Sequence, residues 1–86
     1  MSGVHAHRLP GKPAVDSLAA IKNTFTPDAA AQVEGLLRDL LTAKIRDPQT
    51  LIQLHETALF LRAYPQSSRV LKLSEQLLFS FGDRLP

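Results

Sequence analysis

Two proline-containing signals divide the chain into helix-sized segments. Thr26-Pro27 and Asp47-Pro48 each place a side chain that can cap a helix directly before a proline, and proline is favoured at the first position of a helix. Pro65 then ends the segment that begins at Pro48, because the residue before a proline disfavours helical geometry. The spacing predicts an all-α fold in which helices begin at Pro27 and Pro48.

The apolar residues of these two segments follow different patterns. From Pro27 to Arg46 they recur at intervals of three and four, which predicts an amphipathic helix with one buried face. They are Val33, Leu36, Leu37, Leu40, Leu41 and Ile45. From Asp47 to Tyr64 apolar residues point almost all the way round. This pattern predicts a central helix that is covered on more than one side. The short connection predicts that the two helices are antiparallel neighbours.

A last helix is expected after Ser67 or Ser68, which can cap it, and before Gly82. Its main apolar face is formed by Val70, Leu73, Leu77 and Phe81. Leu71 and Leu78 form a second strip about 100° away around the helix, and Phe79 lies outside both. We expect the second strip to be covered by an N-terminal helix, by another chain, or by further parts of a longer protein.

The N-terminal part of the chain predicts a flexible arm followed by a single domain. Residues 1–13 contain glycine and proline without apolar periodicity, which is typical of an arm. A short helix is expected from about Val15 to before Thr26. Residues 14–86 are then one helical domain: a small antiparallel bundle or helical-hairpin stack of three main helices plus the short one.

The segment from Pro65 to Asp83 resembles one junction of a tetratricopeptide-type helical repeat. Those repeats place a proline near the end of one helix and a Gly-Asp pair 17 residues later, as Pro65 and Gly82-Asp83 do here. Leu71 and Leu78 match two large residues of that family's helix. The sequence departs from the family pattern where the family has small residues: these positions hold Gln53, Phe60 and Glu75. The resemblance implies a helical interaction fold.

Composition excludes several classes of function. The chain has 86 residues, no cysteine and a formal net charge of +2. Disulfide scaffolds, thiol nucleophiles and cysteine-ligated zinc are therefore excluded. There is no apolar run long enough for a membrane span and no apolar signal region within residues 1–13, so we expect a cytoplasmic protein.

The motifs of catalysis and metal binding are incomplete. His55-Glu56 begins like a zinc-protease helix, but position 59 is leucine where the second histidine is needed. His5 and His7 lie in the expected arm. The sequence has no nucleophile elbow, phosphate-binding glycine loop or dinucleotide fingerprint. We therefore expect a protein that is not an enzyme and has no cofactor and no metal.

The favoured functional hypothesis is protein–protein interaction or self-association, including a possible homodimer. Its surface would be the exposed strip of the last helix with two polar neighbours from the preceding helix. The expected residues are Leu71, Leu78, Phe79, Arg62 and His55. Exposed apolar strips of this kind mark protein partners.

Two alternatives remain open. Arg69, Lys72 and Gln76 form a polar side on the last helix, which is compatible with a small DNA-binding or regulatory domain. The chain is also compatible with an N-terminal segment that supports the rest of a larger protein.

Overall fold

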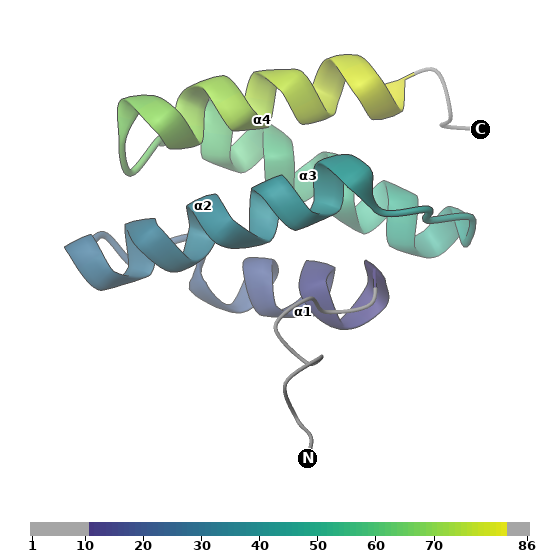
Figure 1. Cartoon of the computed structure of the whole chain (residues 1–86), viewed down its shortest axis with the longest axis horizontal. Helices are drawn as coiled ribbons and strands as arrows, with labels where there is room; N and C mark the ends of the chain where they lie inside the picture. The colour runs from purple at the N-terminus through teal and green to yellow at the C-terminus, as the bar shows by residue number, and fades with distance from the viewer. Residues whose placement is uncertain (1–10, 83–86) are drawn as a thin grey trace.

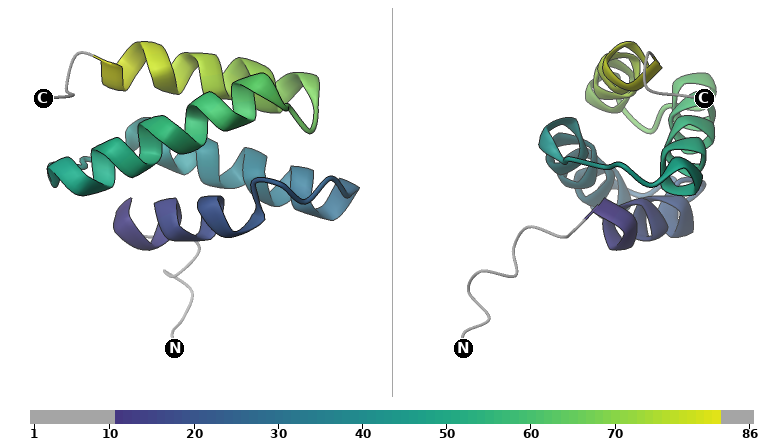
Figure 2. Two further views of the ribbon diagram at one scale, coloured as in Figure 1. Left: turned by 180° about the vertical axis from the view of Figure 1, so that it is seen from behind. Right: turned by 90° about the vertical axis from the view of Figure 1, so that its right-hand side faces the viewer.

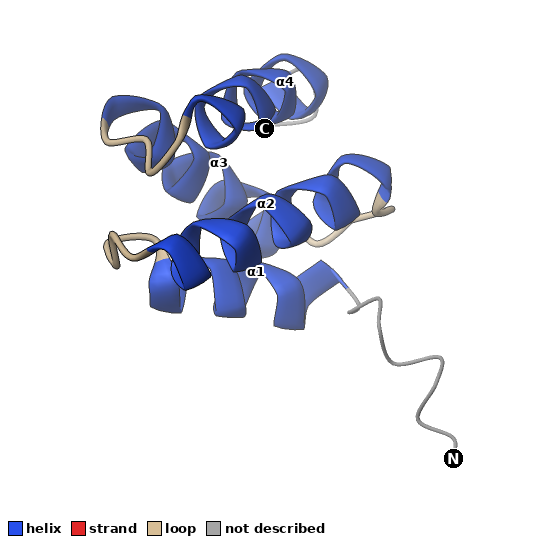
Figure 3. Cartoon of the chain, turned by 60° about the vertical axis from the view of Figure 1, so that its left-hand side comes forward, coloured by secondary structure: helices blue, strands red, loops and turns tan. Residues whose placement is uncertain are grey.

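A computed structural model describes residues 11–82, and this part of the chain folds into helices without strands. The helices are α1 (Gly11–Ile21), α2 (Pro27–Thr42), α3 (Pro48–Ala63) and α4 (Ser68–Phe81). Figure 1 shows them as a compact stack, and Figure 3 shows that only short loops separate them. The predicted all-α fold is confirmed.

Local capping explains where three of the helices begin. The side-chain oxygens of Thr26, Asp47 and Ser67 each accept a hydrogen bond from the backbone N–H three residues later, at 3.2, 2.9 and 3.1 Å. Pro27 and Pro48 occupy the first turn of α2 and α3, where a missing N–H costs nothing. The predicted starts of α2, α3 and α4 agree with the structure.

Two predicted boundaries differ from the structure. Helix α1 begins at Gly11, so residues 11–13 belong to the helix and not to the arm; Pro13 is tolerated because it lies in the first turn. The rest of the predicted arm lies outside the described residues. Helix α2 ends at Thr42 and not at Arg46, because the chain becomes extended at Ala43 to cross to α3.

The four helices run in alternating directions and surround a common core (Figure 1). Helix α1 packs against α2 and α3, and α4 also packs against α2 and α3. The end-on view in Figure 2 shows α2 and α3 on opposite sides, with their connecting loop crossing between them. The prediction that α2 and α3 are antiparallel neighbours was therefore wrong. Their directions are opposite, but each packs mainly on α1 and α4.

The core is one cluster of buried apolar side chains to which every helix contributes. Its members are Ala14, Val15, Leu18, Val33, Leu37, Leu40, Ile45, Leu51, Leu54, Ala58, Leu61, Val70, Leu77 and Phe81. Ile45 reaches this cluster from the α2–α3 loop and is 7% exposed. Ser74 is also buried, and its hydroxyl donates a 2.7 Å hydrogen bond to the carbonyl of Val70. This buried hydroxyl therefore finds its hydrogen-bond partner within α4 itself.

Helix α3 is buried on one side only. Its buried residues, which include Leu54, Ala58 and Leu61, share one face. Ile52 and Leu59 lie on the opposite side and are each 37% exposed. The prediction of a central helix covered on several sides was therefore wrong, because the bundle offers α3 neighbours only at α1 and α4.

Candidate functional site

The outer side of the bundle is hollowed where α2 and α4 lie next to each other. Two adjoining hollows of about 320 and 500 Å³ share Lys72 and Gln76 in their walls, so we describe them together as the α2/α4 groove. Its lining residues are Arg38, Leu41, Arg69, Lys72, Leu73, Glu75, Gln76, Phe79 and Ser80.

One end of the α2/α4 groove is basic. Arg38 of α2 and Arg69 and Lys72 of α4 line the smaller hollow, and no acidic side chain of the described residues lines it with them. Glu34 lies close by: a carboxylate oxygen is 3.6 Å from a guanidinium nitrogen of Arg38, and the other accepts a 3.2 Å hydrogen bond from the Ser67 hydroxyl. One carboxylate against three cations leaves this end positively charged.

The other end of the groove is apolar at its surface. Leu41 of α2 and Phe79 of α4 both line the larger hollow. Phe79 is 89% exposed, and Leu41 is half-buried against the core. Glu75 is the acidic residue of this hollow. The groove therefore combines a cationic end near the start of α4 with an aromatic side chain near the end of α4.

Helical periodicity explains why α4 supplies these side chains. Positions three and four apart share a helix face, so Arg69, Lys72 and Gln76 lie along one flank of α4, as the DNA-binding alternative assumed. The structure adds Arg38, which sequence reasoning missed. Arg38 reaches this flank because α2 packs beside α4. The sequence showed only that Arg38 lies on the polar side of α2, which does not distinguish a groove residue from any other exposed residue.

Most of the predicted partner-binding residues lie on a different flank. Since the flank of α4 with Arg69 and Gln76 faces α2, the opposite flank, with Leu71 and Leu78, faces α3. Leu78 packs on the core and Leu71 is half-buried. Helix α3 is therefore the neighbour of this strip, whereas α1 packs on α2 and α3. Phe79 points away from this junction, on the outer side of α4.

His55 and Arg62 belong to the corresponding flank of α3. Gln53 and Phe60 mark the flank that faces α1: Gln53 binds Asp16 at 3.1 Å, and the ammonium nitrogen of Lys22 lies 5.1 Å from the ring centroid of Phe60. His55 and Arg62 occupy the opposite flank, toward α4; His55 is half-buried and Arg62 exposed. The fold thus brings four of the five predicted residues to the α3/α4 junction and leaves Phe79 apart.

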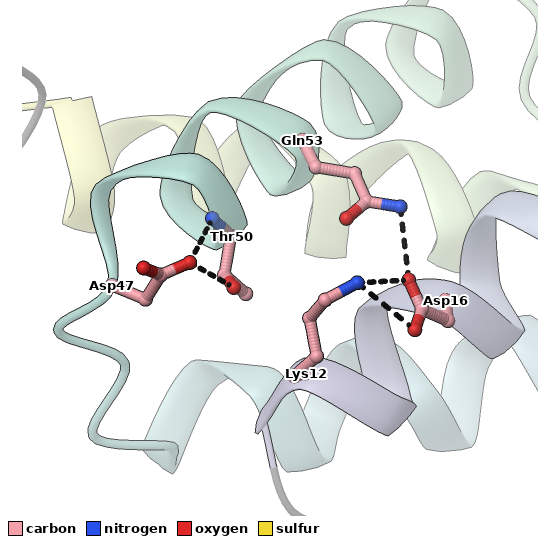
Figure 4. A network of polar contacts seen from close by, with 5 residues as sticks. All are labelled: Lys12, Asp16, Asp47, Thr50 and Gln53. Atoms are coloured by element: carbon pink, nitrogen blue, oxygen red, sulfur yellow. Dashed lines mark hydrogen bonds and ion pairs between the residues drawn. The ribbon is translucent and has the colours of Figure 1, made fainter.

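A polar network joins α1 to α3 (Figure 4). The Lys12 ammonium donates to both carboxylate oxygens of Asp16, at 2.9 and 3.1 Å, and Gln53 donates to the same carboxylate at 3.1 Å. These hydrogen bonds, from Lys12 first and Gln53 second, hold the pKa of Asp16 below its ordinary value. In the same figure, hydrogen bonds from the Thr50 hydroxyl and then its N–H lower the pKa of Asp47. Both sites are structural.

Gln66 ties the α3–α4 turn to the end of α1. Its side-chain nitrogen lies 3.2, 3.1 and 2.6 Å from the carbonyl oxygens of Ile21, Lys22 and Thr24. Ile21 is the last residue of α1, and its carbonyl also accepts a 3.0 Å hydrogen bond from the Thr24 N–H; Gln66 supplies a donor to the turn that follows α1 from a distant part of the chain. Sequence reasoning had no signal for this contact.

A third hollow, of about 640 Å³, lies between α1 and α2. Its lining residues are Ser17, Ala20, Ile21, Gln32, Gly35, Leu36, Arg38 and Asp39. The two charged members, Arg38 and Asp39, have opposite signs. This surface therefore lacks the charge selectivity of the basic end of the α2/α4 groove.

Within residues 11–82, no three His, Asp or Glu side chains come together in a group that could hold a metal ion. None of the helices in this range is long and apolar enough to cross a membrane. Comparison of the chain with family models, with curated proteins and with solved structures gave no match. The resemblance to tetratricopeptide repeats has no support here beyond the helix ends near Pro65 and Gly82; Asp83 lies outside the described residues.

Proposed function

We propose that this domain is a non-catalytic protein–protein interaction module that uses the outer side of α4. The observation that carries the proposal is Phe79, an aromatic side chain that is 89% exposed beside a hollow. Large aromatic side chains at the surface are the residues that most often anchor protein partners, because burying them removes much apolar area from water.

The charge of the α2/α4 groove favours a different protein over a second copy of this chain. A symmetric dimer whose two-fold axis passes through the basic end would bring Arg38, Arg69 and Lys72 close to the same residues of the other copy. Like charges at short distance repel. Self-association centred on the basic end is therefore the less favoured form of the proposal.

A nucleic-acid partner is the second candidate, favoured by the finding that Arg38 joins Arg69 and Lys72. Binding to nucleic acid depends largely on Lys and Arg side chains that neutralise phosphates, and a strongly bound protein can make about six to ten such contacts. The three cations here supply fewer contacts, and Phe79 and Leu41 continue the groove with apolar surface. A protein partner matches both ends of the groove, so it is the function we put first.

Site-specific photo-crosslinking tests the proposed function. A benzoylphenylalanine replaces Phe79 in one variant and Phe25 in a matched control, since Phe25 is also exposed, at 57%, but precedes α2 and does not line the groove. In cells of the source organism, we expect a crosslinked protein adduct from position 79 that is absent from position 25.

Each result of this experiment has a definite meaning. An adduct with a different protein at position 79 supports the proposal, and an adduct of twice the chain mass identifies self-association. Adducts with nucleic acid, or equal protein adducts at both positions, would overturn it. Light scattering of the purified protein across a range of concentrations gives an independent measure of self-association.

A further inference from the structure

We infer that the α2/α4 groove binds an acidic amphipathic helix of another protein, with the acidic residues of that helix near the start of α4 and a large apolar residue near Phe79. This inference rests on the proposed function and specifies the chemistry of the partner.

Charge complementarity selects an acidic partner. Arg38, Arg69 and Lys72 line the smaller hollow together, and the carboxylate near them, that of Glu34, already contacts Arg38 and Ser67. Glu75 lies in the other hollow. A docked carboxylate at the basic end would face several cations, whereas a docked cation would be repelled by them.

The position of Arg69 supports a role in binding and not in stabilising α4. It lies in the first turn of α4, directly after Ser68, and this turn has no acidic residue. The N-terminus of a helix carries a partial positive charge, so a cation there is unfavourable for the helix itself. Its location is favourable, however, for a ligand that brings negative charge to the groove.

The dimensions of the groove fit a short helix. Arg69 and Phe79 are ten residues apart on α4, which corresponds to about 15 Å along the helix axis, or roughly three turns. Helices α2 and α4 run in the same direction on either side (Figure 1), and an amphipathic helix commonly docks between such walls. Leu73 lines the smaller hollow together with the cations and gives the apolar face of the docked helix a contact there.

Defined peptides test this inference without knowledge of the natural partner. The probe is a fluorescein-labelled helical peptide of about 14 residues, with glutamates in its first two turns and leucine and phenylalanine on one face of its last turns. A matched peptide carries glutamine in place of each glutamate. Binding is measured by anisotropy at low salt, and backbone amide shifts in NMR spectra show where the peptide binds.

We expect the acidic peptide to shift the backbone amide signals of α2 and α4. It should bind roughly tenfold more tightly than the glutamine peptide, because each exposed ion pair contributes at most about fivefold and the basic end offers more than one cation. Arg69→Glu should remove this preference. Arg46→Glu is the control: it makes the same change of charge at an exposed loop residue that does not line the groove. Phe79→Ser should weaken both peptides.

Several results would overturn the inference. They are equal binding of the two peptides, equal weakening by Arg69→Glu and Arg46→Glu, amide shifts confined to other helices, or no binding up to about 1 mM peptide. Tighter binding of a DNA duplex than of the acidic peptide would assign the groove to nucleic acid. If the peptides fail while position 79 still crosslinks to a protein in cells, the inference is wrong but the proposed function stands.

Discussion

The same substitution, glycine to alanine, is expected to have opposite effects at Gly35 and Gly11. Gly35 lies within α2, and apart from its chain neighbours and the backbone of its own helix a Cβ added there would meet no atom of the described residues within 4 Å. Its φ is not positive, so alanine can adopt the same backbone geometry. Because glycine loses more conformational freedom on folding, Gly35→Ala should raise the free energy of unfolding by about 0.5–1 kcal/mol.

Gly11 lies in close contact with the α2–α3 loop. A Cβ added to Gly11 would lie 2.7 Å from Cγ1 of Ile45 and 3.3 Å from Cδ1. Ile45 is only 7% exposed and belongs to the core cluster, so it has little room to move. Overpacking of this kind commonly costs about 1–3 kcal/mol, and we expect Gly11→Ala to lower the free energy of unfolding.

Urea unfolding followed by circular dichroism at the helix band measures both effects. The urea dependence of the free energy should stay unchanged, because neither substitution alters the surface exposed on unfolding. The midpoint should rise for Gly35→Ala and fall for Gly11→Ala, and the melting temperature of Gly35→Ala should rise by about 2–8 °C. A fall for Gly35→Ala, or a rise for Gly11→Ala, would refute the packing described around these glycines.

Three further predictions concern polar residues. Gln66→Ala should lower the free energy of unfolding by about 1–2 kcal/mol, measured by urea unfolding, because the carbonyls of Lys22 and Thr24, after α1, lose this donor. Arg69→Glu should raise it by about 0.3–1 kcal/mol at low salt, since it replaces a cation in the first turn of α4; a fall would contradict the dipole argument. The lowered pKa values of Asp16 and Asp47 mean that their carboxylates stabilise the folded state. This contribution is fully present above the ordinary pKa of 3.8 and is lost as the pH falls through the lower pKa values of the folded state. Asp47→Asn should weaken this acid dependence, which is measured by thermal melts recorded across pH.

The helix starts could be predicted from the sequence because their causes are local. Thr26, Asp47 and Ser67 each cap a backbone N–H three residues away, and the adjacent prolines Pro27 and Pro48 are visible in the sequence. The end of α2 was misplaced because Ile45 continues the apolar period although it reaches the core from a loop. Periodicity records which residues are buried, but not which element carries them.

The arrangement of the helices could not be predicted in the same way. A short loop suggested that α2 and α3 are neighbours, but the loop crosses the end of the bundle (Figure 2). Leu59 and Ile52 contributed to the expectation of a central α3, yet both are partly exposed. The choice between these packings depends on how α1 and α4 fill the space between them, which is a property of the whole chain.

The candidate site could be predicted in part. Periodicity placed Arg69, Lys72 and Gln76 on one flank of α4, and the structure has them in the groove. Arg38 is 31 residues before Arg69 in the chain, so only the packing of α2 beside α4 could reveal it. The role of these residues remains a prediction for the peptide experiment.

The diagonal course of the α2–α3 loop bears on how the chain could exchange parts with another copy. Helices α1 and α2 precede this loop, α3 and α4 follow it, and the two pairs pack on each other, while residues 43–47 are the covalent link between them. If this connection straightened, the first pair of one chain could dock on the second pair of another and regain the same contacts, as in domain swapping. Ile45 opposes that exchange, because straightening would draw its buried side chain out of the core. The side chain that fills the end of the bundle thus also favours folding within a single chain.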